Sequence, residues 1–88
     1  MRKFGVLVLA ASVVLPSAVF AGDKVKIDQV PAPVRATIEK ETKGGSVKEI
    51  ERETKGGVKM YEVEYVRDNK KYELHVGEDG KVLKHKSD

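Results

Sequence analysis

The most constraining feature of this sequence is a pair of short runs in which apolar and polar residues alternate. The first run covers residues 61–65 and the second covers residues 72–76. Their apolar members are Tyr61, Val63, Tyr65, Tyr72, Leu74 and Val76. A period of two places such side chains on one face of a β-strand. Asp68 and Asn69, which lie between the runs, are typical turn residues. The sequence therefore predicts an antiparallel hairpin with one apolar and one charged face.

The register of this hairpin also follows from the pattern. A slip by one residue would mix apolar and charged side chains on both faces, which disfavours every register but one. A two-residue loop at Asp68 and Asn69 satisfies the pattern, because it places Val63 opposite Leu74. The same reasoning applied to the preceding strand places Ile50 opposite Val63.

Weaker strand signals flank the hairpin on both sides. Residues 47–53 precede a Gly-Gly pair at 56–57, and a short strand at 82–83 follows an Asp-Gly turn. In this last strand we expect Leu83 to face Val76. Together with the central hairpin, these segments predict a single antiparallel four-stranded sheet.

The segment before the sheet predicts a helix over residues 31–43. Two prolines suit its first turn, where backbone amides have no helical partner. Val34 and Ile38 are four residues apart and share one face. Gly44 and Gly45 then favour termination. The predicted fold class is α+β, with one main helix packed on the apolar face of the sheet.

The N-terminal segment, residues 1–21, has the composition of a signal peptide. Arg2 and Lys3 precede an apolar stretch from residue 4 to residue 14, and small residues occur up to Ala21. This order is typical of secretory signals, and the apolar stretch is short for a membrane span. We therefore expect cleavage after Ala21, no stable membrane insertion afterwards, and a periplasmic or secreted protein.

The remainder of the chain divides into an expected disordered N-terminus, residues 22–26, and one domain, residues 27–88. These two parts hold 15 of the 17 basic side chains and all 14 acidic side chains. Such a balanced charge lacks the basic excess of nucleic-acid-binding proteins, so we expect no nucleic-acid partner.

Catalytic chemistry has little support in the sequence. The chain has no cysteine, and Ser46 and Ser87 lie outside any nucleophile motif. Carboxylates are plentiful, but general acid–base catalysis needs a concave pocket, and a small sheet has an open outer face. We therefore expect a protein that is not an enzyme.

The predicted charged face of the sheet is the candidate site. Its candidate partner-binding or cation-binding residues are Glu49, Glu51, Glu62, Glu64, Glu73 and His75. Carboxylates that face one another across strands repel, and a cation or a basic partner relieves this repulsion. Oxygen ligands suit Ca²⁺, and an added imidazole suits Zn²⁺ or another transition metal.

Plainer interpretations of these residues stay open. The acidic face is also compatible with a solvated surface that Lys48, Lys59, Lys84 and Lys86 partly neutralise. His75 and His85 are expected to be ordinary surface histidines, because two histidines without a cysteine are not a zinc signature. The three tyrosines are expected in the core, with their hydroxyl groups at its rim.

The order of these elements resembles the PepSY family, in particular its small exported single-domain members. The similarity consists of a proline-led helix, a Gly-Gly pair, Tyr-x-Val at 61–63, Tyr-x-Leu-x-Val at 72–76 and Asp-Gly-Lys-Val at 79–82. It spans residues 27 to 86. The resemblance implies a helix packed on an antiparallel sheet and no catalytic motif. It also implies binding or inhibition of other exported proteins, because related modules occur in the propeptides of secreted metallopeptidases.

Three functions remain open at this point. The first is an exported non-enzymatic binding module that inhibits or regulates a peptidase or another exported or envelope protein. The second is a periplasmic protein that binds or senses a divalent cation through the acidic face. The third is a small structural protein of the cell envelope. No resident cofactor is expected apart from such a cation.

Overall fold

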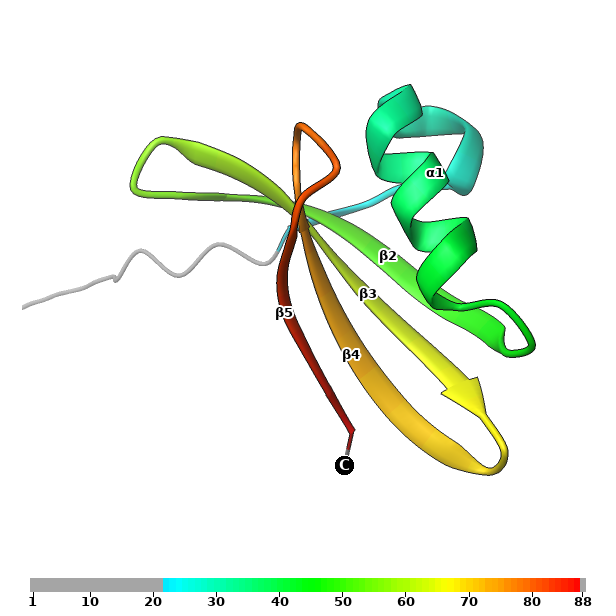
Figure 1. Ribbon diagram of the computed structural model, residues 1–88. Coiled ribbons are helices and arrows are strands. Elements are labelled where there is room, and N and C mark those ends of the chain that lie inside the picture. Colours follow the sequence, from blue (N-terminus) through cyan, green and yellow to red (C-terminus); the bar gives the residue numbers. More distant parts are fainter. Residues whose placement is uncertain (1–21, 88) are drawn as a thin grey trace, which may run out of the picture.

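The computed structural model describes residues 22–87, in which one helix lies across an antiparallel sheet (Figure 1). The elements in chain order are β1 (Asp23–Lys24), the 3-10 turn η1 (Ile27–Gln29), α1 (Ala32–Glu41), β2 (Ser46–Lys55), β3 (Val58–Arg67), β4 (Lys70–Gly77) and β5 (Val82–Ser87). The signal peptide expected at residues 1–21 lies outside the described residues. Within residues 22–87, no helix is long and apolar enough to cross a membrane.

The sheet has five strands rather than the expected four. Its order is β1-β2-β3-β4-β5, and every neighbouring pair is antiparallel. The additional strand, β1, comes from the segment that was expected to be disordered. Asp23 and Lys24 pair with Arg52 and Glu51, and the next amide, of Val25, continues the contact with β2. The free backbone groups at the edge of β2 explain this pairing, because a passing chain segment can satisfy them.

The predicted helix is present and is shorter than residues 31–43. Pro31 is its N-cap and Pro33 lies in its first turn. At its other end, the Thr42 amide and hydroxyl both donate to the Ile38 carbonyl. Gly44 then adopts a φ of +83°, which a residue with a side chain rarely takes. This conformation ends α1 and turns the chain into β2, as the Gly-Gly pair predicted.

The hairpin between β3 and β4 has the register that the alternating pattern predicted. Val63 pairs with Leu74 and Tyr65 pairs with Tyr72. The connecting residues have positive φ angles, 54° at Asp68 and 65° at the following Asn69. Two consecutive positive φ angles are those of a type I′ turn, whose twist matches that of the flanking strands.

The core lies between α1 and one face of the sheet, which we call the inner face. Ile50, Val63 and Leu74 form one row across β2, β3 and β4, and each is at most 4% exposed. Val34 and Ile38 of α1 belong to the same buried cluster. Its other members are Val30, Tyr61, Tyr65 and Val76. Each fully buried apolar side chain contributes about 1.5–3 kcal/mol to folding. The opposite face of the sheet, which we call the outer face, carries the charged residues.

The pairing of β5 differs from the prediction at one point. Val82, rather than Leu83, lies opposite Val76, while Lys84 pairs with His75 as expected. The register shift between His75 and Val76 makes Leu83 the additional residue of a β-bulge. The turn between β4 and β5 explains this shift. The Gly77 amide donates a hydrogen bond to the Lys81 carbonyl, and Leu83 is then left without a partner between the pairs Val76–Val82 and His75–Lys84.

Candidate metal centre on the outer face of the sheet

The centre of the outer face is a row of charged residues that crosses all five strands. Lys24, Glu51, Glu62, His75 and Lys84 are successive partners in this row. The acidic and imidazole groups occupy the three central strands, and lysines occupy the two edges. Because each strand alternates its side chains, the core register fixes this row on the face opposite α1.

A second charged row runs beside the first. Glu49, Glu64, Glu73 and Lys86 are its successive partners across β2 to β5. All six sequence-predicted candidates therefore lie on one face. They do not all converge, because Glu49 pairs with Lys24 at 3.6 Å and Glu64 is exposed.

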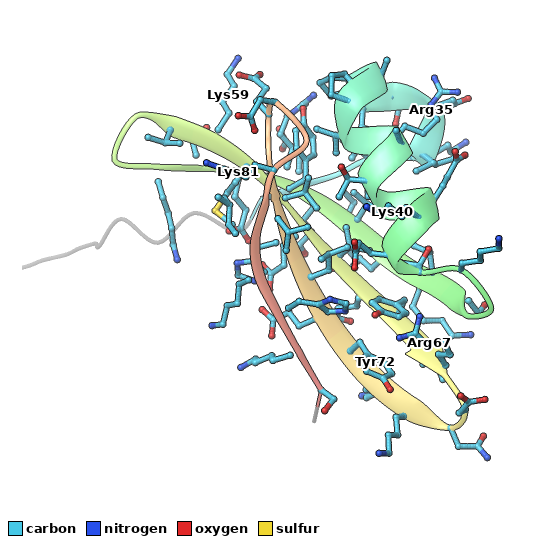
Figure 2. The ribbon with its side chains drawn as sticks, in the orientation of Figure 1. Arg35, Lys40, Lys59, Arg67, Tyr72 and Lys81 are labelled. Atoms are coloured by element: carbon cyan, nitrogen blue, oxygen red, sulfur yellow. The ribbon has the colours of Figure 1, made fainter. Side chains whose placement is uncertain are left out.

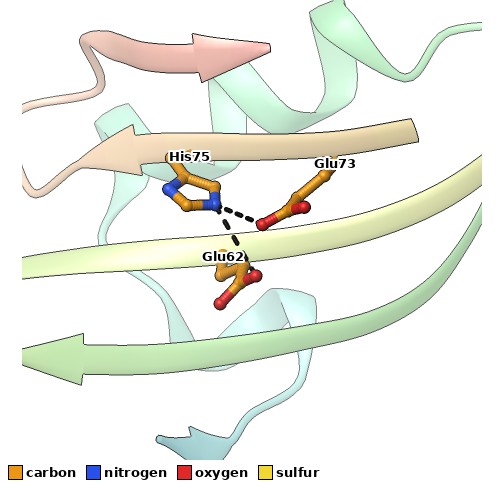
Figure 3. A group of neighbouring side chains, drawn as sticks. All are labelled: Glu62, Glu73 and His75. Atoms are coloured by element: carbon orange, nitrogen blue, oxygen red, sulfur yellow. Dashed lines mark hydrogen bonds and ion pairs between the residues drawn. The ribbon is translucent and has the colours of Figure 1, made fainter. Parts of the chain in front are cut away.

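The closest convergence is between Glu62, Glu73 and His75 (Figure 3). The His75 Nε2 atom is 2.7 Å from Glu73 Oε2 and 3.6 Å from Glu62 Oε2. The His75 side chain is only 12% exposed, and both glutamates are 26% exposed. One ligand atom from each of the three residues lies within 4.8 Å of the others.

A second group of three carboxylates adjoins the first. It contains Glu51, Glu53 and Glu62, so Glu62 belongs to both groups. Glu53 is not among the candidate residues predicted from the sequence, because the predicted strand ends at that residue. The signal was present nonetheless: Glu53 lies two residues after Glu51, and alternation places both on one face.

The crowded carboxylates change one another's proton affinity. The pKa of Glu62 is raised to about 8, first because its carboxyl group hydrogen-bonds Glu73 and then because of Glu53 and partial burial. The same hydrogen bond, helped by His75, lowers the pKa of Glu73 to about 2. The pKa of Glu51 is raised, chiefly by a hydrogen bond with Glu49. Glu62 therefore keeps its proton to a higher pH than an isolated carboxyl group does, and a cation bound there would compete with that proton.

This donor set fits a divalent transition metal. Two carboxylate oxygens and one imidazole nitrogen are ligands that Zn²⁺ accepts, and three protein ligands plus water form a common open zinc site. Zinc–ligand distances are about 2.0–2.2 Å, so small side-chain rotations that bring Glu62, Glu73 and His75 together would be sufficient. A site for Ca²⁺ would need more oxygen ligands, which the adjoining group at Glu51 and Glu53 offers.

A separate polar cluster joins the inner face of β5 to the end of α1. The Tyr65 hydroxyl hydrogen-bonds His85 Nε2, and His85 Nδ1 lies 3.5 Å from a Glu41 carboxylate oxygen. His85 is thus not the ordinary surface histidine that was expected, since it ties the edge strand to the core. The sequence does not predict these contacts of His85, because they depend on how β5 lies relative to the end of α1 in the folded protein.

The tyrosines behave largely as expected. Tyr61 and Tyr65 are buried, while Tyr72 is partly buried at the rim and stacks on Tyr65 at a centroid distance of 4.9 Å. Arg67 covers this pair, with its guanidinium carbon 5.0 Å from the Tyr72 ring centroid (Figure 2). Arg67 also donates to the Glu41 carbonyl at the end of α1. Arg67 therefore links the stacked tyrosines to the end of α1, beside a small hollow of about 60 Å³ that both tyrosines line.

Comparison of the chain with protein-family models, with curated proteins and with solved structures found no match. The resemblance to the PepSY family accordingly stays a prediction from the sequence.

Proposed function

We propose that this protein is a small exported binding module without catalytic activity, and that it binds a divalent transition-metal ion on the outer face. The observation that carries the proposal is the convergence of Glu62, Glu73 and His75, whose ligand atoms lie within 4.8 Å of one another. Two of these residues come from β4 and one from β3, so a rigid hairpin holds them. Ligands on regular strands need little reorganisation on binding.

The electrostatics of the outer face support the same ligand. A raised pKa at Glu62 and a lowered pKa at Glu73 mean that one proton is retained between two carboxylates. A metal ion would replace that proton and relieve the repulsion more fully. The open face leaves room for water or a partner group to complete the coordination.

Titration of the purified protein with Zn²⁺ by isothermal calorimetry tests this proposal. We expect saturable binding at one ion per chain and a higher melting temperature, because a ligand of the folded state stabilises it. His75→Ala and Glu62→Gln should abolish both effects. Glu64→Gln is the matched control, because Glu64 lies on the same strand and face but in neither convergent group. A flat response to Zn²⁺, Cu²⁺, Ca²⁺ and Mg²⁺ would refute the proposal.

The second candidate ligand is another exported protein, such as a peptidase that the module inhibits. This proposal depends on the PepSY resemblance, and the open acidic face favours it because charged side chains on three adjacent strands are accessible there. Passage of the exported-protein fraction over the immobilised protein, with and without EDTA, separates the two candidates. A partner retained in EDTA and lost with Glu49→Lys/Glu64→Lys would support protein binding through this face. Retention by that variant would exclude the face as the contact.

A further inference from the structure

The strand β5 forms an open edge of the sheet. It pairs with β4 on one side, and no other strand of residues 22–87 lies along its second side (Figure 1). All six of its residues, Val82–Ser87, are exposed. An edge strand presents unpaired backbone N–H and C=O groups, which can form a ladder with a further extended segment.

The charge of this edge selects the kind of segment that fits it. Lys84 and Lys86 occupy alternate positions of β5 and share the outer face. Of these two lysines, only Lys86 has an ion-pair partner among the described residues, namely Glu73 at 3.7 Å. The strand itself contains no carboxylate. A neighbouring strand with carboxylates at alternate positions would therefore be favoured, and a basic strand would be repelled.

A hollow with both apolar and charged side chains in its lining lies near the beginning of β5. The bulge places Leu83 next to Gly77, so that a Cβ at Gly77 would lie 3.8 Å from the Leu83 Cδ1 atom. Val58, at the tip of the β2–β3 hairpin, lines the same hollow of about 550 Å³. The charged residues of its lining balance one another: Lys59, Lys81, Glu78 and Asp79. Val58 is 62% exposed and Leu83 is 51% exposed. Two large apolar side chains are thus presented to solvent within one recess.

We propose that β5 is a docking edge for an extended acidic segment of a partner protein, which adds a sixth strand to the sheet. Its carboxylates would lie against Lys84 and Lys86, and an apolar side chain would enter the hollow at Leu83 and Val58. A second copy of this chain is a poor occupant of the edge, because pairing of two β5 strands would oppose lysine to lysine. This surface adjoins the candidate metal centre, because Lys84 pairs with His75 and Lys86 lies 3.7 Å from Glu73. Addition of a strand at β5 nevertheless requires no bound ion.

A synthetic peptide tests the charge requirement. The probe is a capped, fluorescently labelled peptide that contains Glu-Thr-Glu-Thr-Leu, and its control has lysine in place of both glutamates. We expect fluorescence anisotropy to show saturable binding of the acidic peptide alone, with EDTA present. Lys84→Glu/Lys86→Glu should weaken this binding at least tenfold and should create binding of the lysine peptide. Arg35→Glu/Lys40→Glu, two exposed positions on α1, makes the same change in net charge and should leave binding intact.

A backbone measurement tests the strand pairing itself. We expect the peptide to slow amide hydrogen exchange in β5, and Leu83→Ser to weaken binding without altering the unliganded fold. Equal loss of binding in the α1 control variant would overturn the proposal, because it would indicate attraction by net charge alone. Protection confined to other strands would overturn it as well. Self-association through β5 in sedimentation experiments, with no effect of the peptide, would assign the edge to a second copy instead.

Discussion

Glu62 lies directly opposite His75 on the outer face of the sheet, with the carboxylate Oε2 and imidazole Nε2 atoms 3.6 Å apart. Glu73 lies on the same strand as His75, two residues before it, and its register partner is Glu64. Its carboxylate nevertheless approaches the imidazole more closely than that of Glu62 does. Three ionisable groups thus share a space that one cation or one proton can fill. The stability of the protein should therefore respond to pH and to point changes in ways that this arrangement specifies.

The first prediction concerns the pH dependence of stability, measured by urea unfolding with EDTA present. The pKa of Glu62 rises on folding from 4.5 to about 8, so its stabilising contribution is present below pH 4.5 and is lost as the pH rises towards 8. The pKa of Glu73 falls to about 2, so its contribution is lost as the pH falls from 4.5 towards 2. The pair should favour stability most near pH 4.5.

A matched pair of variants isolates this effect. Glu62→Gln should remove most of the decrease in unfolding free energy between pH 5 and pH 8, whereas the exposed Glu64→Gln should keep it. An identical pH profile in both variants would mean that Glu62 is not the group that retains the proton.

The second prediction tests the two faces of β3. Val63 is fully buried and the adjacent Glu64 is exposed on the opposite face. Val63→Asp should unfold the protein, since an unpaired buried charge costs several kcal/mol and a small domain has about 5–15 kcal/mol in total. Glu64→Lys should change stability by less than about 0.5 kcal/mol. Circular dichroism melting distinguishes the two outcomes, and equal tolerance would contradict the register.

The third prediction concerns the turn between β4 and β5, which contacts the start of α1. Gly80 has a φ of +90°, and a Cβ there would lie 2.7 Å from the Pro33 carbonyl oxygen. Its own carbonyl accepts a hydrogen bond from Thr37. Gly57 has a similar φ of +81° but has no atom near the Cβ position. Both Gly→Ala variants introduce backbone strain of about 1–2 kcal/mol, and only Gly80→Ala adds a collision.

Chemical denaturation should therefore rank Gly80→Ala below Gly57→Ala in stability by at least about 1 kcal/mol. In a domain of this size, that difference corresponds to about 4–8 °C in melting temperature. Equal losses would show that the turn does not pack on α1.

The fourth prediction concerns the hydrogen bond between Tyr65 and His85. Tyr65→Phe removes the hydroxyl and leaves the imidazole without that partner, which should lower the unfolding free energy by about 1 kcal/mol. Tyr61→Phe is the control, because the buried Tyr61 hydroxyl has no hydrogen-bond partner among residues 22–87. Urea unfolding of both variants provides the measurement. A smaller loss for Tyr65→Phe than for Tyr61→Phe would contradict a tie between β5 and the core.

The sequence predicted which residues share the face of the candidate site, but it did not predict which of them lie close together. Alternation placed Glu62, Glu73 and His75 on one face, and the hairpin register then followed from the core. Which of the carboxylates converge depends on the twist of the sheet, which brings diagonal neighbours such as Glu62 and Glu73 closer than a flat ladder would. A pattern of single residues contains no information about that twist.

The sequence by itself determined the elements that local chemistry controls. Period-two alternation specified β3, β4 and their register, and the Gly-Gly pair indicated that the helix ends before Gly44, because backbone conformation and side-chain facing are local properties. Tertiary structure decided the rest. It paired Asp23 and Lys24 with a free edge, displaced Leu83 into a bulge and brought His85 to Tyr65, because each of these contacts joins segments whose meeting depends on the packed sheet as a whole.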